Sequence, residues 1–162
     1  MSSTASAVLL WLFVINLGIA FGAGLYEHRV VISRWITSSR ESGRHWNADA
    51  ARSDDTGRRF WVFVTTLPLT LLTLGNLYVG WRASVPARRW WLAAGLAALA
   101  DRVVTFAYFI PTMIGLLAAA DSLESVARAV RWQSLNYLRH AFVLAAWLAS
   151  LAAFSLFYQQ GG

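Results

Sequence analysis

Hydrophobic residues along this chain gather into four long runs, and polar, charge-rich stretches separate them. The runs cover about 5–25, 60–81, 90–111 and 135–158. Each comes close to the roughly 20 apolar residues that a helix needs to cross the hydrocarbon core of a bilayer. The pattern therefore predicts an all-α fold, in which residues 1–162 form a single integral membrane domain built as a bundle of four transmembrane helices.

The connections between the runs differ in length. The first, 29–59, is long and polar, with seven arginines and four acidic residues. Its apolar opening, 30–36, is predicted to lie at the membrane interface or over the mouth of the bundle. The second, 82–89, is short, as is typical between antiparallel neighbours. Before the fourth run, residues 121–124 (Asp-Ser-Leu-Glu) resemble a capping sequence, so an amphipathic helix should begin there and continue into the fourth span.

Glycines and prolines punctuate the apolar runs. Gly18 and Gly22 form a GxxxG spacing, which predicts the close approach of another helix. Pro68 removes a backbone hydrogen bond and is predicted to bend the second helix, while Pro111 predicts a break or bend where the third helix ends. Three threonines on one stripe, Thr66, Thr70 and Thr73, are expected to supply hydrogen bonds in place of the backbone bond that Pro68 removes.

Composition agrees with a membrane protein and narrows the chemistry. The chain is 57% hydrophobic, has nine tryptophans, and contains no cysteine. The absence of cysteine excludes thiolate nucleophiles, disulfide relays, iron-sulfur clusters and cysteine-ligated haem. The net charge of +6 comes from fourteen arginines and no lysine. Because most of these arginines lie in the connections, they are expected to set topology and meet anionic lipid headgroups, and nucleic acid is not an expected partner.

Four spans place both termini on one side of the membrane and the first and third connections together on the other. Nine arginines are predicted on the second side, at positions 29, 34, 40, 44, 52, 58, 59, 128 and 131, against three opposite, at 82, 88 and 89. The positive-inside rule then favours cytoplasmic first and third connections, in a bacterial-type plasma membrane.

A polar stripe enters the fourth span. Trp132, Asn136, Arg139 and His140 fall on one helix face, because residues three and four apart stack along a helix. Ionisable side chains within a membrane must face protein or water, since exposure to lipid costs a few kcal/mol or more. The stripe therefore predicts a polar bundle interior at this end.

Further ionisable residues are expected to meet this stripe. Glu27 and His28 end the first span and are predicted to lie opposite His140. Asp101 and Arg102 lie within the third span. Neighbouring side chains on a helix diverge by about 100°, so this pair is not expected to bond squarely. Arg102 is instead predicted to meet Glu27, and Asp101 to meet Arg139 or His140; a purely structural buried ion pair remains the alternative.

Together these residues make a mixed acid, base and cation cluster with aromatic walls. Such a set suits proton abstraction from a hydrophobic substrate, with a histidine or glutamate as base and an arginine or asparagine holding the oxyanion. The candidate catalytic residues are Glu27, His28, Arg102, Asn136, Arg139 and His140. The candidate substrate-binding residues are Asp101, Thr105, Tyr108 and Trp132.

A metal-dependent alternative uses some of the same side chains. Glu27, His28 and His140 offer nitrogen and oxygen ligands that suit iron or another transition metal. No HxxxH or HxxH pair occurs in the sequence to strengthen this set. The first interpretation requires no cofactor.

Several short motifs resemble the anthrone-oxygenase-like family of small four-helix membrane proteins. They are Tyr26-Glu27-His28 after the first span, Phe60-Trp61 opening the second, Thr105 with Tyr108-Phe109-Ile110-Pro111 closing the third, and Trp132, Asn136, Leu138 and Arg139 opening the fourth. The resemblance implies the oxidation of a fused aromatic, such as an anthrone, to a quinone by molecular oxygen. It also implies roles for Trp132, Asn136 and Arg139, and for Thr105 and Tyr108. The long Arg-rich first connection, with Ser33 where a proline is expected, departs from the family pattern.

A non-enzymatic interpretation stays open beside the enzymatic ones. Intramembrane charges also fix the assembly of small transporter subunits and membrane partner proteins. Four helices are few for a transport pathway unless the protein forms a homo-oligomer. No inverted repeat, which would favour transport, is visible in the sequence.

Overall fold

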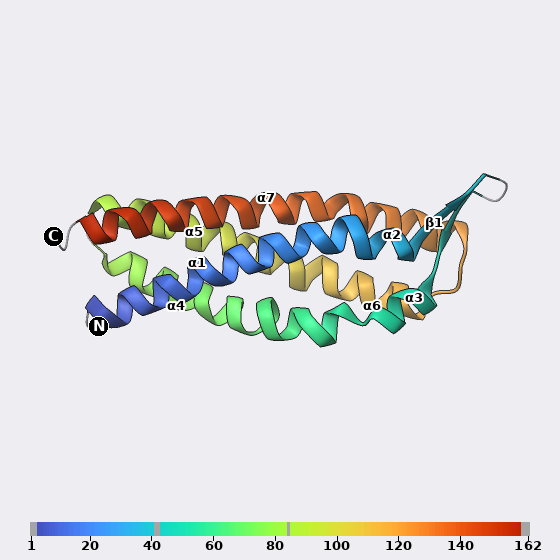
Figure 1. Cartoon of the computed structure of the whole chain (residues 1–162), viewed down its shortest axis with the longest axis horizontal. Coiled ribbons are helices and arrows are strands. Elements are labelled where there is room, and N and C mark those ends of the chain that lie inside the picture. Colours follow the sequence, from blue (N-terminus) through green and yellow to red (C-terminus); the bar gives the residue numbers. More distant parts are fainter. Residues whose placement is uncertain (1–2, 41–42, 84, 160–162) are drawn as a thin grey trace.

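The computed structural model describes residues 3–40, 43–83 and 85–159. Its helices lie side by side, with both chain ends at one end of the bundle and β1 and α3 at the other (Figure 1). The π-helices are labelled η. The elements are α1 (Ser3–Tyr26), η1 (Glu27–Val31), α2 (Ile32–Trp35), β1 (Ile36–Ser39), β2 (Gly43–Trp46), α3 (Ala48–Asp54), η2 (Gly57–Thr66), α4 (Pro68–Arg82), α5 (Val85–Val104), η3 (Thr105–Phe109), α6 (Ile110–Ala118) and α7 (Leu123–Gln159).

The predicted all-α bundle of four spans is confirmed. Within the described residues, four helices are long and apolar enough to cross a membrane: Thr4–Trp35, Gly57–Arg82, Pro86–Ala118 and Leu123–Gln159. All four, with 32, 26, 33 and 37 residues in chain order, exceed the roughly 20 residues that cross hydrocarbon. They therefore project beyond the bilayer core. The part of the helices that projects lies at the end opposite the chain termini, because arginines are exposed there at positions 29, 34, 128 and 131.

Two helices extend beyond the predicted spans. The first continues past residue 25, because η1 and α2 carry it to Trp35. The third continues past Pro111 to Ala118. Pro111 lies where η3 passes into α6. Both extensions bury apolar side chains in one cluster, including Val31, Ile32 and Leu116, and this burial sustains the helices past the hydrocarbon core.

The start of α7 confirms the predicted cap and the uninterrupted fourth helix. Ser122 Oγ accepts a hydrogen bond from the Ser125 N–H at 3.1 Å, and Ser125 Oγ accepts one from the Ser122 N–H at 2.9 Å. This reciprocal pair satisfies N–H groups that the first turn leaves free. From there α7 runs as one helix to Gln159.

The backbone around Pro68 is satisfied differently from the prediction. The Val64 carbonyl, four residues before the proline, accepts a hydrogen bond from Asn16 Nδ2 of α1 at 2.7 Å. The threonines bond elsewhere, since Thr70 donates to the Thr66 carbonyl and Thr73 to the Leu69 carbonyl. A threonine on a helix reaches the carbonyl four residues back, and four residues after Val64 stands the proline itself. The substitute donor therefore comes from a neighbouring helix.

The most extensive helix interface joins α5 to α7. Small residues line it on both sides, and the buried ones are Ala94, Ala98, Ala146, Ala149 and Ala153. Small side chains let helix backbones approach closely in a membrane, where packing rather than hydrophobicity drives association. The interface brings the polar residues of α5 against those of α7.

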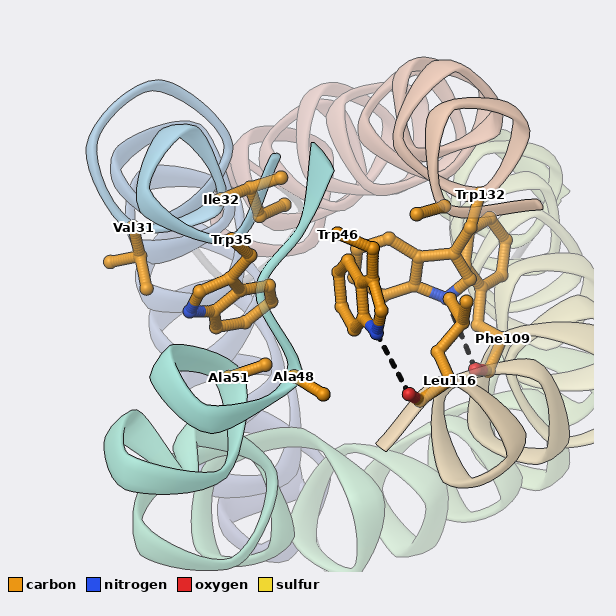
Figure 2. Packing of buried hydrophobic residues seen from close by; sticks show 10 residues of the cluster. Val31, Ile32, Trp35, Trp46, Ala48, Ala51, Phe109, Leu116 and Trp132 are labelled. Carbon is orange, nitrogen blue, oxygen red and sulfur yellow. Dashed lines mark hydrogen bonds between the residues drawn. The ribbon is translucent and has the colours of Figure 1, made fainter. Parts of the chain in front are cut away.

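The first connection is a folded cap, made of β1, β2 and α3, rather than an irregular linker. The strands form an antiparallel hairpin in which Ile36 pairs with Trp46. Trp46 lies inward against the helix ends, and its Nε1 donates to the Leu116 carbonyl at 2.9 Å (Figure 2). The backbone N–H of Trp46 and the ring of His45 both bond the carboxylate of Asp121, at 2.9 and 2.7 Å. Both bonds lower the pKa of Asp121, and the bond from the Trp46 N–H lowers it more than the bond from His45.

The cap joins the first connection to the third, so the two lie on the same side of the bundle as predicted. The predicted interfacial segment 30–36 forms the end of η1, all of α2 and the start of β1, where the first helix meets the cap. Trp35 and Ile32 are almost completely buried. Trp35 Nε1 donates to Asp54 Oδ2 at 2.8 Å, which fastens α3 to the end of α2.

The GxxxG spacing of α1 serves helix packing at one glycine. A Cβ on Gly18 would lie 3.2 Å from the indole ring of Trp147 on α7. A Cβ on Gly22 would meet nothing within 4 Å. Only the first glycine of the pair therefore permits a close approach.

Gly18→Leu should lower the free energy of unfolding by about 1–3 kcal/mol, because the added side chain overlaps a rigid ring. Gly22→Leu is the matched control on the same helix and should be neutral or stabilising. Both are measured by denaturant titration in detergent micelles. Equal losses for the two variants would contradict the packing described for Gly18.

Candidate functional site

A cavity of about 680 Å³ lies beneath the cap, between the first, second and third helices and α7. Most of its wall is apolar or aromatic. Figure 2 shows three of its aromatic residues, Trp35, Phe109 and Trp132. Trp132 is fixed in place because its Nε1 donates to the Phe109 carbonyl at 3.1 Å. The volume and the flat walls suit a fused aromatic ring system.

All three π-helices reach this cavity. Glu27 comes from η1, Trp61 and Thr65 come from η2, and Thr105 and Phe109 come from η3. A π-turn inserts an extra residue into a helix and redirects the side chains beside it, and such turns are frequent at functional sites. Their coincidence around one cavity marks it as the candidate site.

Glu27 is the acidic group of the inner wall. Its Oε1 accepts hydrogen bonds from Thr56 Oγ1 at 2.6 Å and from Trp61 Nε1 at 2.7 Å. Within the described residues both bonds fall on this one oxygen, so Oε2 remains able to accept a proton or bind a ligand. The two donors hold the carboxylate in one orientation.

Arg139 lines the same cavity as a basic group, as does the exposed Arg58 at the cap end. Arg139 Nε donates to Asp101 Oδ1 at 3.4 Å, and its NH1 donates to Asn136 Oδ1 at 3.1 Å. Its guanidinium also lies 4.8 Å from the centre of the Phe109 ring. The predicted contact between Asp101 and Arg139 is therefore present, and three neighbours orient the guanidinium.

The expectation that Asp101 and Arg102 would not pair was wrong. Arg102 donates through Nε and NH2 to Asp101 Oδ2. Its NH1 donates to the Thr65 carbonyl at 3.0 Å, so the predicted contact with Glu27 is not formed. Although neighbouring side chains diverge, an arginine is long enough to fold back. Complete burial of Asp101 makes the nearest cation the best partner.

One carboxylate, that of Asp101, thus pairs with both Arg102 and Arg139. These three side chains together carry one more positive charge than negative charge. Asp101 and Arg102 are buried away from the cavity, whereas Arg139 lines it. Arg139 therefore presents a positive charge to the cavity, where the carboxylate of Glu27 attracts it. A ligand that is polar at one edge and apolar elsewhere complements this arrangement.

The two predicted histidines lie outside this wall. His28 and His140 pack together with their ring centres 5.6 Å apart, and His28 lies 4.3 Å from the ring of Tyr137. Gly24 makes room for them, since a Cβ there would lie 2.9 Å from His140 Nε2. In the described part of the chain neither ring lines the cavity. Glu27 turns toward the cavity while the next residue, His28, turns toward His140, because neighbouring side chains diverge.

Of the remaining predicted residues, one lines the cavity and the others contact residues that line it. Thr105 is buried in the wall, and its Oγ1 has no hydrogen-bond partner among the residues that the structure describes. Asn136 is buried behind Arg139 and also donates to the Trp132 carbonyl at 3.0 Å. Tyr108 packs edge-on against Phe109 and does not line the cavity among the described residues.

The alternative metal set is not assembled. Among residues 3–40, 43–83 and 85–159, no three His, Asp or Glu side chains are placed to hold a metal ion. Glu27 is engaged by Thr56 and Trp61 on the cavity side, whereas His28 and His140 contact each other. These three residues therefore do not form one ligand set.

Several residues that line the cavity were not among the predicted site residues, because their role depends on tertiary contacts. Trp61 and Trp35 carry the pattern of interfacial aromatics, yet both line the cavity and one bonds Glu27. Thr56 and Thr65 gave no signal beyond a polar position. The Phe60-Trp61 motif in the family resemblance was the one pointer to Trp61.

The chain matches no model of a known protein family, no curated protein and no solved structure. The resemblance to the anthrone-oxygenase-like family therefore remains a prediction.

Asp101→Asn should lower the free energy of unfolding by about 3–5 kcal/mol, because it leaves two arginines without their buried counterion. Asp49→Asn, at a carboxylate that is 93% exposed in its ion pair with Arg52, should change it by less than about 1 kcal/mol. Denaturant titration in micelles measures both. A small loss for the Asp101 variant would show that the network is not a structural requirement.

Thr105→Val should leave the protein without ligand at least as stable as the wild type, because it removes a buried hydroxyl that costs about 1–3 kcal/mol when unpaired. Thr73→Val is the matched control. Its buried hydroxyl donates to the Leu69 carbonyl at 2.7 Å, so its loss should be neutral or destabilising. The comparison uses melting temperatures in one detergent. A Thr105 variant less stable than the Thr73 variant would show that the Thr105 hydroxyl is satisfied.

Proposed function

We propose that this chain is an integral-membrane oxidoreductase that binds a hydrophobic, anthrone-like aromatic in its cavity and oxidises it with molecular oxygen. One observation carries the proposal. A carboxylate, Glu27, and a guanidinium, Arg139, both line a single cavity whose remaining wall is mostly apolar and aromatic. This is the pairing of base and oxyanion holder that proton abstraction from a hydrophobic substrate requires.

Glu27 acts as the base in this proposal. Thr56 and Trp61 hold its Oε1, and Oε2 is left to take a proton from the substrate. The sequence alone left histidine and glutamate open as the base. The cavity favours Glu27, because His28 and His140 are directed elsewhere in the described structure.

Arg139 stabilises the negative charge that proton removal creates. Asp101 and Asn136 bond it from behind and so position it, while neither lines the cavity in the described part of the chain. Arg102 acts one step further away, by holding Asp101. The preorganised guanidinium does not need to rearrange as the oxyanion forms, which is the main source of electrostatic catalysis.

The reaction balances with oxygen as the oxidant. Glu27 takes a proton from the CH2 group of the anthrone, which leaves an enolate whose oxygen Arg139 binds. The enolate passes one electron to O2, and the two radicals join through a new C–O bond. The resulting peroxide anion recovers the proton from Glu27 and becomes a hydroperoxide. Its O–O bond then breaks together with the second C–H bond, so that water leaves and a C=O group remains. The electron-rich enolate reacts with oxygen without requiring a metal.

We also place the capped, arginine-rich end in the cytoplasm. The exposed arginines of the first helix and of α7 lie at this end, which the positive-inside rule assigns to the cytoplasmic side. A substrate made by soluble enzymes would then meet the protein on the side of its candidate site.

Glu27→Gln should reduce oxygen uptake with anthrone by about 10²- to 10⁴-fold, because the amide cannot accept the proton. Glu124→Gln, an exposed change at the start of α7, is the matched control and should leave uptake unchanged. Uptake is followed with an oxygen electrode on protein in lipid nanodiscs, and quinone formation by absorbance.

The double variant His28→Ala/His140→Ala distinguishes the two candidate bases. It should retain uptake, since neither ring lines the cavity. Loss of uptake in this variant, with Glu27→Gln still active, would transfer the base to a histidine. Wild-type protein that binds anthrone without consuming oxygen would contradict the oxidation and favour a transporter or partner role.

A further inference from the structure

We infer that the cavity takes its ligand from the lipid bilayer, through a lateral opening between η2 and α6, so that the ligand is a membrane-dissolved molecule with one polar edge. That this ligand is also oxidised rests on the proposed function. The route rests on the packing of the cap and of the two helices.

The cap closes the end of the cavity that faces water. Trp46 and Asp121 tie the hairpin to the ends of α6 and α7. Arg52 of α3 donates to the Leu117 carbonyl, and the Asn47 N–H donates to the Trp35 carbonyl at 2.7 Å. These bonds join the cap to the helices on two sides. Entry from water would require several of them to break together.

The side wall is built differently. η2 and α6 both line the cavity, yet they pack against other elements. η2 packs on α1 and continues into α4, whereas α6 packs on α3, η3 and α7. No extensive packing joins η2 to α6 in the described structure. The wall of the cavity between them is therefore formed by side chains alone.

The surface beside this opening is apolar. Phe63 and Leu67 of the second helix are 70% and 61% exposed, and Ile114 of α6 is 64% exposed. No charged residue occurs in α6, and the two charged residues of η2, Arg58 and Arg59, lie at its start, next to the cap. Exposed apolar side chains of this size belong in contact with lipid. The opening therefore faces acyl chains or the headgroup boundary.

The lining changes character from this opening inward. Val62 comes from η2, Met113 and Ile114 come from α6, and Glu27 and Arg139 lie deeper, on the first helix and α7, while Asp55 and Arg58 line the cavity at its cap end. A charged solute would lose several kcal/mol on crossing the apolar entrance. A neutral, largely hydrophobic molecule with one hydroxyl or carbonyl edge would cross it and then be held at that edge.

A cysteine placed in the cavity tests the route. The chain has no cysteine of its own, so Thr105→Cys carries a single thiol in the buried wall. Protein in nanodiscs is labelled either with N-(1-pyrenyl)maleimide dissolved in the lipid or with sulfonatoethyl methanethiosulfonate added in water. Both rates are divided by those of Ser38→Cys on the exposed hairpin. The relative rate should be at least about tenfold higher for the lipid-dissolved reagent.

A bulky residue at the opening locates the route. Ile114→Trp or Thr66→Trp, each added to Thr105→Cys, should slow lipid-borne labelling by about tenfold. Leu71→Trp is the matched control, because Leu71 is 70% exposed on α4 and does not line the cavity. It should leave the rate unchanged.

Three results would overturn the inference: faster labelling from water, no labelling by either reagent, or equal effects of the plug and control variants. Labelling requires no turnover, so it separates this inference from the proposed function. Lipid-borne labelling in a protein that consumes no oxygen would contradict the oxidation alone. Oxygen uptake with labelling from water would contradict the route alone.

Discussion

The cost of leaving an ion unpaired inside a membrane governs the arrangement of this protein. Asp101 is completely buried and lies between Arg102 of its own helix and Arg139 of α7. Without these partners the carboxylate would be severely destabilising, so the register of α5 against α7 is constrained by this contact. Alanines along the same interface allow the helices to come close enough for it to form. The second arginine, Arg139, faces the cavity, where it meets the charge of Glu27.

The candidate site appears where regular helix geometry is interrupted. Three helices each contain a π segment at the level of the cavity, and these segments supply Glu27, the hydroxyls of three threonines and part of the aromatic wall. A regular helix would direct the side chains of neighbouring turns along a continuous stripe. The π turns shift that stripe and allow Glu27, Trp61 and Thr105 to converge on one space. The cap then covers the end of this space, and the bundle leaves one side toward lipid.

Much of the fold followed from patterns that depend on one segment at a time. Four apolar runs predict four spans because the bilayer sets a minimum length, and Ser122 predicts the start of α7 because capping is local. The helix ends were less predictable. Val31 and Leu116 extend their helices by packing under the cap, whose hairpin gave no clear signal in a polar connection. The donor for the Val64 carbonyl was missed because Asn16 comes from another helix.

The sequence by itself determined that this chain is a bundle of four membrane helices with a polar interior at its arginine-rich end, because hydrophobic length and helical spacing are properties of single segments. It also identified Glu27, Asn136 and Arg139 as candidates. Only the tertiary structure decided that Glu27 turns toward a cavity while His28 turns away, and that Arg102 folds back onto Asp101. Side-chain direction at a π turn and the partner of a buried charge depend on what neighbouring helices present. Spacing along one helix does not contain that information.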